Sequence, residues 1–502
     1  MLHVKKHIFT LLLMWLAVGL SAAPITREQA RQKAVEFLKN ARGSKQLAPV
    51  QNKTKLSPRR LAPKAQRELY YVFNRGYNEG YVIVSGDDKT LSVLGYTEEG
   101  EFDYNNLPDN MRYWLQGYEQ QLLYLSEHPE SMTETPRYAP THDRVEPMVK
   151  SKWNQGDPYN RSCPTDTDGR RSVTGCVATA MAQILYYNRE KMVTETQAQI
   201  PAYEKWSHKV KVAAIPEGSP IDWDNMADNG GSNDVQRKAV ADLMLYCGAS
   251  VKMDYTSSSS GAQVSDVFQA FKTYFGLGST LVYHNGLSSD IDDVEWDRIV
   301  YQDLAAGNVV LVSGYTADWQ GHAFVADGYD GNRHYHINWG WGGSSDGYYL
   351  LTNLTPGQQG IGGSDDGSGF STGLQIITGI EPVNYATRQM NFSDQTVRRL
   401  CLNNWDSDGD GKLTYGEAAA VTDLGEVFSG QRIQQFPELY YFTGLSTIGD
   451  GAFSGCQQLT TLRLPKGLKR IGSRAFAGCS RLTKIELPSA LTAIVLRPNC
   501  PA

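Results

Sequence analysis

The sequence is poor in cysteine, in net charge and in long apolar runs. Its 502 residues include 7 cysteines, an odd number that is too small and too scattered for a disulfide framework. The formal net charge is only −6, which gives no electrostatic reason to expect a nucleic-acid partner. A chain of this length exceeds one ordinary hydrophobic core, so roughly two to four domains are expected.

The first 23 residues contain the main apolar run of the chain. Lys5 and Lys6 precede an apolar stretch from Ile8 to about Leu20, and small residues close it. This pattern predicts a secretory signal peptide over 1–23, and the run is too short for a stable membrane span, although a membrane anchor is the alternative. We therefore expect a secreted protein, extracellular or cell-surface associated, with no integral membrane segment after signal cleavage.

Cys176 lies at the head of a helical pattern in the stretch TGCVATAMAQILYY. Unsatisfied N–H groups and the helix dipole favour an anion at such a position, and this setting lowers the pKa of a thiol. A small buried cysteine without reactivity is the competing interpretation, and this segment alone leaves both open. Cys163 in a polar loop and Cys247 on the apolar side of a helical pattern are weaker candidates.

A reactive thiol needs an imidazole to share its proton, and His322 in WQGHAFVADGYD is the candidate. A glycine precedes it and an apolar strand pattern follows. Asn338 stands downstream in HINWGWGG, where its oxygen could accept the ring N–H. His334 and His336 alternate on one strand face, and we interpret them as structural because no third metal ligand follows at a useful spacing.

Four segments, NQGDPYN, TGCVATAMAQILYY, GHAFVADGYDG and YHINWGWGGSSDGYY, together resemble the streptopain family of papain-like cysteine peptidases. The resemblance implies an α+β, papain-like fold of two subdomains. It implies that Cys176 is the nucleophile and His322 the general base and acid. It further implies that Asn338 lies beside the pair, that Trp339 shields it, and that Gln155 donates to the oxyanion together with the Cys176 N–H.

The resemblance also suggests a division of the chain and a mode of control. The predicted segments are a signal peptide at 1–23, an inhibitory propeptide of small α+β fold at 24–140, the peptidase at 141–382, a linker with a calcium loop at 383–445, and leucine-rich repeats at 446–502. Loops 254–261 and 357–373 are expected to line the substrate cleft. Maturation is expected near 130–146, where Arg137 and Arg144 offer cleavage points and self-cleavage elsewhere in the linker is the alternative. A permanent partner-binding domain is the competing interpretation of the N-terminal segment.

The leading hypothesis is a secreted cysteine endopeptidase made as a zymogen, inhibited by its own propeptide. It would hydrolyse peptide bonds of extracellular proteins through a thioester and needs no cofactor for catalysis. One alternative is a cell-surface adhesin with a vestigial peptidase domain. A second is a thiol acyltransferase or transglutaminase that uses the same cysteine and histidine.

The stretch DSDGDGKLTYGE matches the template of a calcium-binding loop. It predicts a structural Ca²⁺ site, similar to those of EF-hands and dockerins, and a solvated acidic turn is the alternative. Lys412 would contribute its backbone carbonyl and Glu417 a bidentate carboxylate. The predicted metal-binding residues are Asp406, Asp408, Asp410, Lys412, Thr414 and Glu417.

The end of the chain contains an internal repeat. Residues 448–470 and 471–493 match at nearly every fixed position, an offset of 23 residues (471 − 448), and they resemble leucine-rich repeats of BspA type. Two units are fewer than a solenoid usually needs, so the repeats either lean on the preceding segment or are a remnant. A possible partner is a cell-surface or host protein.

Overall fold

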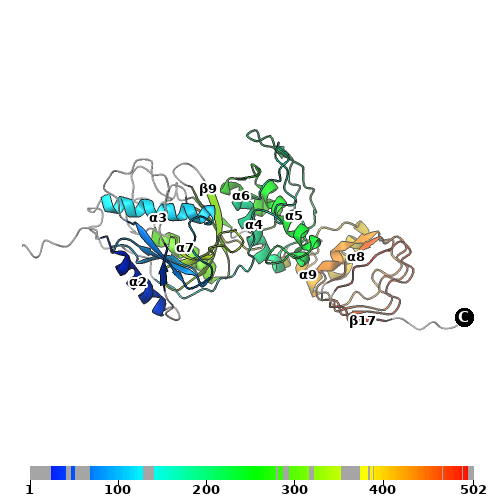
Figure 1. Ribbon diagram of the computed structural model, residues 1–502. Coiled ribbons are helices and arrows are strands. Elements are labelled where there is room, and N and C mark those ends of the chain that lie inside the picture. The colour runs from blue at the N-terminus through cyan, green and yellow to red at the C-terminus, as the bar shows by residue number, and fades with distance from the viewer. Residues whose placement is uncertain are drawn as a thin grey trace, which may run out of the picture. The chain divides into compact units, whose positions relative to one another are not determined.

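A computed structural model describes most of the chain. The chain divides into two compact units, Met1–Glu381 and Pro382–Ala502 (Figure 1). The predicted signal peptide, the 357–373 loop and Arg137 lie outside the described residues. Within the described part, no helix combines the length and the apolar character needed to cross a membrane. The described residues are 24–40, 47–50, 68–127, 141–278, 281–285, 293–315, 321–351, 374–382, 385–387, 389–465, 467–488 and 490–495.

One ten-stranded sheet runs through the first unit in the order β1-β2-β3-β4-β11-β10-β9-β8-β12-β7. Neighbouring strands are antiparallel. The strands are β1 (Leu47–Pro49), β2 (Tyr70–Arg75), β3 (Tyr81–Ser85), β4 (Val93–Tyr96), β7 (Val282–Asn285), β8 (Val310–Tyr315), β9 (Gly321–Tyr329), β10 (His334–Asn338), β11 (Gly347–Leu350) and β12 (Gln375–Thr378).

The predicted propeptide segment joins this sheet directly. Its last strand, β4, pairs with β11 of the 141–382 segment, so that Tyr96 faces Tyr348 and Gly95 faces Tyr349. Sequence patterns predict a small α+β domain over 24–140, and its elements form as expected, but its strands extend the neighbouring sheet. Main-chain hydrogen bonds therefore link the two segments.

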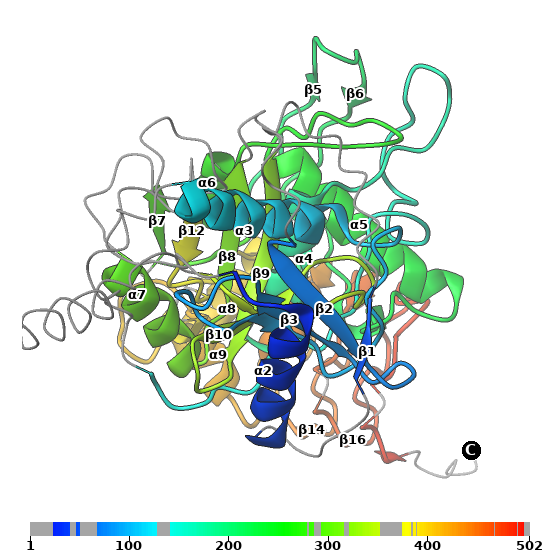
Figure 2. The same cartoon turned by 60° about the vertical axis from the view of Figure 1, so that its left-hand side comes forward.

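Two helices cover opposite faces of the propeptide strands: α2 (Arg27–Asn40) and α3 (Asp109–Glu127), as Figures 1 and 2 show. Alternation along β3 explains this arrangement, because successive side chains of a strand point to opposite faces. Val82 and Val84 pack in the core beneath α2, whereas Tyr81 and Ile83 pack in the core beneath α3. The α3 core also contains residues of β9, β10 and β11, so this helix spans both segments.

The remaining helices of the first unit are α4 (Cys176–Tyr187), α5 (Asp234–Ser250), α6 (Val264–Tyr274) and α7 (Asp293–Ala305), with a small hairpin of β5 (Tyr203–Glu204) and β6 (Lys211–Val212). Short 3₁₀ turns occur at Arg189–Lys191 and Trp223–Asn225. Helix α4 is buried along almost its whole length and packs against α5 and β9. Helices α4, α5 and α6 each lie where the spacing of apolar residues in the sequence predicts a helix.

The second unit begins with helices α8 (Gln395–Trp405) and α9 (Tyr415–Ala420) and continues as stacked turns with very short strands. The strands β14 (Thr447–Ile448), β16 (Arg470–Ile471) and β17 (Ala493–Ile494) are parallel and in register, as the 23-residue period requires. A second parallel pair joins β13 (Gln435–Phe436) to β15 (Thr461–Leu462), and 3₁₀ turns lie at Tyr385–Thr387 and Pro437–Tyr441.

The stacked turns begin before the two units found in the sequence. The ring of Phe453 stacks on Phe476 on one side and on Phe428 on the other, each at 5.3 Å between centroids. Phe428 begins the tripeptide Phe-Ser-Gly, which recurs at Phe453. The rest of the earlier turn has diverged, which is why comparison of repeat units alone misses it.

Candidate active site

Cys176 is the first residue of α4, as predicted, and Gly175 caps the helix with φ of 83°. A Cβ at Gly175 would lie 2.6 Å from the carbonyl oxygen of Ser260, so only glycine fits this turn. The thiol is half-buried, and burial raises its pKa, although backbone N–H groups of Ala323, Val177 and Cys176 itself act in the opposite direction. The effect of burial on the thiol pKa is therefore larger than that of the helix N-terminus. The sequence predicts a lowered pKa for Cys176, and in this structure the pKa is raised.

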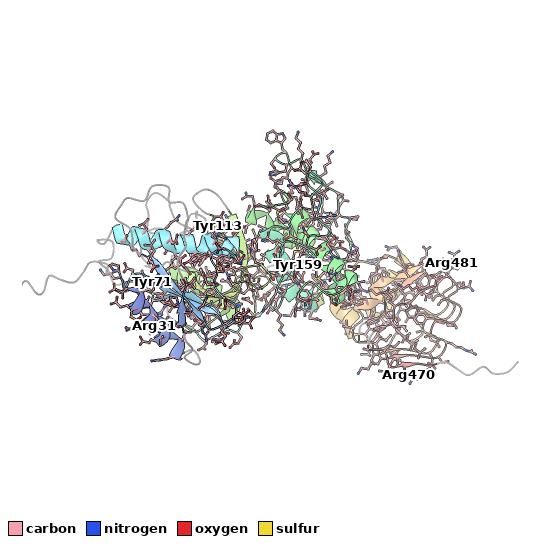
Figure 3. The ribbon with its side chains drawn as sticks, viewed as in Figure 1. Arg31, Tyr71, Tyr113, Tyr159, Arg470 and Arg481 are labelled. Carbon is pink, nitrogen blue, oxygen red and sulfur yellow. The ribbon has the colours of Figure 1, made fainter. Side chains whose placement is uncertain are left out.

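His322 lies near the start of β9, opposite Gly314 of β8. Its ring stacks on Tyr113 of α3, with 4.5 Å between ring centroids and 24° between planes (Tyr113 is labelled in Figure 3). Burial lowers the pKa of His322 to about 4, and the nearby Asp109 carboxylate opposes this only in part. The Nε2 atom is buried and has no hydrogen-bond partner in the described part of the chain.

Strand β9 brings the predicted thiol and imidazole to neighbouring positions. The backbone N–H of Ala323, the residue after His322, donates toward the sulfur of Cys176. Helix α4 and strand β9 are in direct contact, so this approach is part of the main packing of the unit. Both groups favour their neutral forms here, since the pKa of the thiol is raised and that of the imidazole is lowered.

Asn338 ends β10, and its carboxamide bonds to groups other than the His322 ring. Its oxygen accepts from Gln183 Nε2 and from the Gly340 N–H, both at 3.0 Å, and its nitrogen donates to the Ser151 carbonyl at 2.9 Å. The predicted contact between the asparagine oxygen and the histidine is therefore not made in this form. Instead, Asn338 ties α4 to β10.

Trp339 is almost fully buried, and α3 reaches it directly. Its ring centroid is 4.8 Å from that of Phe324 and 6.5 Å from that of Trp114, and its carbonyl oxygen accepts from Asn110 Nδ2 at 2.6 Å. Gln155 lies beside the segment before Cys176, since its carbonyl oxygen accepts from the Thr174 N–H at 3.1 Å.

The α3 residues that contact the site, Tyr113, Asn110 and Trp114, were not singled out from the sequence. The only signal there is an aromatic-rich helix start, DNMRYW, in which nothing indicates the partner of each side chain. Figure 1 shows this end of α3 beside β9.

The two other histidines of interest have partners in the described structure. Nδ1 of His334 lies 2.8 Å from Asp330 Oδ2, and its Nε2 lies 3.0 Å from the Val93 carbonyl oxygen. Nδ1 of His336 lies 2.6 Å from Asp327 Oδ1. These contacts agree with the interpretation of both rings as structural.

Apart from the nucleophile candidate, the described cysteines are unpaired and are packed in the cores. Burial raises the pKa of Cys163 to about 12 and that of Cys456 to about 11, and it also raises the pKa of Cys247. Such thiols are unreactive near neutral pH. The described free cysteines are Cys163, Cys176, Cys247, Cys401, Cys456 and Cys479, and Cys500 lies outside the described residues.

In the acidic loop of the second unit, carboxylate oxygens of Asp406, Asp408 and Asp410 lie within 4.8 Å of one another. The Glu417 carboxylate bonds to backbone and hydroxyl groups of Ser407 and Thr414, and with Thr414 it forms a capping box for α9. Burial alone would raise the pKa of Glu417, but these hydrogen bonds lower it to about 2. In this structure the Glu417 carboxylate thus caps α9.

A cysteine at a helix start, a histidine on the adjoining strand and an N-terminal helix packed on that strand form the arrangement expected of a cysteine peptidase covered by a prodomain. Family models match three regions: the peptidase C10 family over 153–349, the Spi protease inhibitor over 22–122, and the BspA-type leucine-rich repeat region, in six copies, over 427–496.

Streptopain of Streptococcus pyogenes is 32% identical over 411 residues, which are 75% of this chain and 100% of streptopain. The chain therefore belongs to the streptopain family. The thiol protease/hemagglutinin PrtT of Porphyromonas gingivalis is also 32% identical, over 82% of this chain, and the chain spans about half the length of that relative. A prointerpain A fragment of Prevotella intermedia, solved as a cysteine-to-alanine mutant, superposes with a TM-score of 0.55 and 27% identity, over 67% of this chain and 99% of the fragment.

Proposed function

We propose that this chain is the zymogen of a secreted cysteine endopeptidase in which Cys176 is the nucleophile and His322 the general base. The observation that carries the proposal is the approach of the Cys176 sulfur to the backbone N–H next to His322. The two residues come from separate parts of the chain, and their order and spacing match the family pattern. The other described cysteines are buried or belong to the repeats, which leaves one thiol in this setting.

In the mature enzyme the proton of Cys176 would pass to His322, and the thiolate would attack the carbonyl carbon of the scissile bond. The oxyanion would accept hydrogen bonds from the Cys176 N–H and the Gln155 side chain, worth about 3–4 kcal/mol per donor. The imidazolium would protonate the leaving amine, and water activated by neutral His322 would then hydrolyse the thioester.

The prodomain would hold this chemistry off through α3. Tyr113 covers one face of the His322 ring, and burial keeps the ring neutral, with its pKa lowered to about 4. The pKa of the Cys176 thiol is raised at the same time, so a thiolate and imidazolium pair is unfavourable in this form. Asn110, bonded to the Trp339 carbonyl, would fix the adjoining loop.

Asn338 and Trp339 would keep their places after the prodomain leaves, because the hydrogen-bond partners of both side chains lie in the 141–382 segment. The Asn338 carboxamide is already fixed at the end of β10 by three hydrogen bonds. The Trp339 indole donates to the Ser345 carbonyl at 2.9 Å and remains in the core of the sheet. We propose that they border the catalytic pair, with Trp339 limiting the access of water.

The decisive test is hydrolysis of an unfolded protein by the matured enzyme under reducing conditions. Cys176→Ala should abolish it, whereas Cys479→Ala, which alters a half-buried thiol of the repeats, should leave it unchanged. Full activity of Cys176→Ala would exclude the proposal. Release of new amino termini identifies hydrolysis, whereas incorporation of an added amine would identify a transferase.

Export through residues 1–23 and removal of the prodomain near 130–146 complete the proposal. Within this region, Arg144 donates to Glu146 and to the Tyr348 hydroxyl, and Val145 forms a β-bridge with Tyr329. A protease would have to open these contacts to cut at Arg144, so a cut on its N-terminal side is favoured. Mass spectrometry of the secreted active form would locate it, and a mature chain that begins beyond 146 would contradict the expectation.

We also propose that loop 406–417 binds a structural Ca²⁺. The three aspartate carboxylates suit a hard cation, and the Gly411 N–H donates to Asp406 Oδ2 at 2.9 Å, which closes the loop around them. The predicted ligands fit this role in part: the three aspartates lie together, whereas the Glu417 carboxylate caps α9. Calorimetric titration of the chain with Ca²⁺ should give binding that is lost in Asp408→Asn, and no heat with the unaltered chain would refute the site.

The repeats are proposed to bind a cell-surface or host protein. One relative carries hemagglutinin in its name as well as thiol protease, which supports a binding role beside catalysis. The adhesin alternative differs from the leading hypothesis only if the enzyme is inactive. Binding of the Cys176→Ala chain to intact cells, compared with a chain ending at 445, separates the two functions.

A further inference from the structure

The segment 172–175, which leads into Cys176, is fixed by contacts from three directions. The side chain of Asn160, which is buried, donates to the carbonyl oxygen of Ser172, the first residue of the segment, at 3.0 Å. The backbone carbonyl of Gln155 accepts from the N–H of Thr174, the third residue of the segment, at 3.1 Å. The loop 254–261 supplies the contacts of the second residue, Val173, and the Pro164 carbonyl oxygen accepts from the Ser172 N–H at 3.0 Å.

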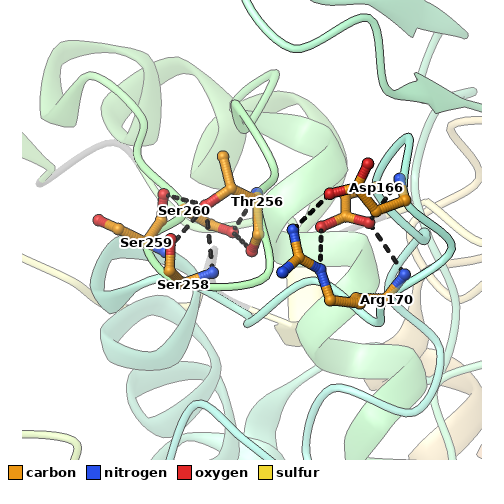
Figure 4. A network of polar contacts seen from close by, with 7 residues as sticks. Asp166, Arg170, Thr256, Ser258, Ser259 and Ser260 are labelled. Atoms are coloured by element: carbon orange, nitrogen blue, oxygen red, sulfur yellow. Dashed lines mark hydrogen bonds and ion pairs between the residues drawn. The ribbon is translucent and has the colours of Figure 1, made fainter.

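Within that loop, Ser260 lies beside Thr256 (Figure 4), and it also contacts Val173. Its hydroxyl has two acceptors in reach, the Val173 carbonyl oxygen at 2.7 Å and the Thr256 carbonyl oxygen at 3.1 Å, and it accepts from the Thr256 N–H at 3.0 Å. The shorter distance favours donation to Val173. The Val173 N–H donates to the Thr256 carbonyl oxygen at 3.0 Å. Both polar backbone groups of Val173 are therefore bonded to the loop, and Ser260 is buried, with 6% of its surface exposed.

The same serine also sets the turn at Gly175. The position of a Cβ on Gly175 is 2.6 Å from the Ser260 carbonyl oxygen, so the two backbones are in close contact. Gly175 caps α4 without a side-chain hydrogen bond. The direction of the first free N–H groups of the helix, including that of Cys176, is therefore set by how the 172–175 segment is held.

We propose that Ser260 is a positioning residue for catalysis: its hydroxyl bond to Val173 aligns the Cys176 N–H with the oxyanion. This inference rests on the proposed function, since it assumes a thioester mechanism at Cys176. An oxyanion donor is effective only when its geometry is kept within a fraction of an ångström. Loss of the Ser260 hydroxyl would let the segment shift while leaving the thiol in place.

The chain offers a matched control in the same segment. Ser172 is fully buried, yet its hydroxyl has no hydrogen-bond partner in the described structure. Ser172→Ala and Ser260→Ala each remove one buried hydroxyl group, one unbonded and one bonded. A difference between them isolates the hydrogen bond from the loss of an atom in the core.

The experiment compares the two variants as matured enzymes, with the concentration of competent sites measured by titration with an irreversible thiol reagent. For Ser260→Ala we expect kcat per titrated site to fall about 10- to 100-fold, with KM within about twofold and alkylation by iodoacetamide little changed. Alkylation needs no oxyanion donor, so it separates alignment from thiol reactivity. Ser172→Ala should match the unaltered enzyme, and Ser260→Thr, which keeps a hydroxyl, should recover most of kcat.

A purely structural role of Ser260 would reduce the number of titrated sites and leave kcat per site unchanged, and this result would overturn the inference. If Ser260→Ala does not fold, Asn160→Ala removes the anchor on the other side of the segment and should lower kcat per site in the same way. Unchanged kcat per site in Asn160→Ala would then count against it. Failure of the proposed function is distinct, because the unaltered enzyme would itself show no hydrolysis.

Discussion

The surroundings of Cys176 and of His322 come from different parts of the chain. Cys176 is contacted by the backbone N–H of Ala323 and follows Gly175, which is held against Ser260, and these residues all lie within the 141–382 segment. The principal ring contact at the imidazole is made by Tyr113 of the prodomain, with the Asp109 carboxylate nearby. The thiol is surrounded by elements of the 141–382 segment, whereas the imidazole, which lies on β9 of that segment, is covered by helix α3 of the prodomain.

This difference indicates where control is exerted. If the surroundings of Cys176 are already formed in the zymogen, they need no rearrangement on activation. Under the proposed function, the prodomain would then act through the protonation and the freedom of the His322 ring. The predictions below test that division, from the largest effect to the smallest.

His322→Gln in the matured enzyme should lower kcat by at least about 10³-fold, since no other group can move the proton. Steady-state hydrolysis of a peptide substrate measures the effect. His336 is the matched control, because its ring is bonded to Asp327 and has a structural role. His336→Gln should therefore retain activity if the protein stays folded. Similar losses in both variants would show that His322 has no special role.

Docking of α3 should weaken as pH falls. The pKa of His322 is about 4 when docked and would return to about 6.5 when Tyr113 leaves. A depressed histidine pKa means that the open form binds more protons, so the docked form is fully favoured above pH 6.5 and loses up to about 3 kcal/mol as pH falls to 4. In the Cys176→Ala zymogen, the protection factors of the α3 amides should therefore fall as the pH is lowered. They are measured by hydrogen exchange, with the rates corrected for the intrinsic pH dependence of exchange.

The pH effect should disappear in that zymogen when His322→Gln is added. An α3 protection factor that is equal at pH 7 and pH 5 in the Cys176→Ala zymogen would break the link between docking and the histidine.

Tyr113→Ala should weaken inhibition about tenfold, because the aromatic contact with His322 contributes about 0.5–1.5 kcal/mol beyond its buried area. Self-processing of the zymogen, followed on gels with time, should accelerate accordingly. Tyr77 is 89% exposed on the same prodomain, and Tyr77→Ala should process at the unaltered rate. Equal rates for all three chains would mean that stacking is not the restraint.

Thr414→Ala should destabilise the second unit by about 1 kcal/mol, because it removes the side-chain cap of α9. Denaturant unfolding of the second unit measures this change. The exposed Thr422 is the control, and Thr422→Ala should change stability by less than about 0.5 kcal/mol. An unaffected midpoint for Thr414→Ala would show that the capping box adds nothing.

Local features of the fold and site could be predicted from the sequence, because they depend on nearby residues. The start of α4 at Cys176 follows from a glycine cap and an apolar period, and the strand that carries His322 follows from its apolar residues. The pairing of β4 with β11 could not be predicted, since strand partners distant in sequence leave no mark in either strand.

The same reason explains the misses at the site. The stacking of Tyr113 on His322 joins two residues that lie far apart along the chain, and an aromatic helix residue is more often simply part of a core. The pKa of Cys176 was expected to be lowered from its helix position alone, but its burial depends on the whole fold. The expected contact of Asn338 with the imidazole is replaced by bonds to Gln183 and Ser151, which sequence spacing does not reveal.

The most direct test of the account is an NMR titration of the His322 ring in Cys176→Ala, before and after removal of the prodomain. The account predicts a pKa near 4 in the zymogen and a value at least about two units higher in the mature chain. The same pKa in both forms would contradict control of the site through the imidazole.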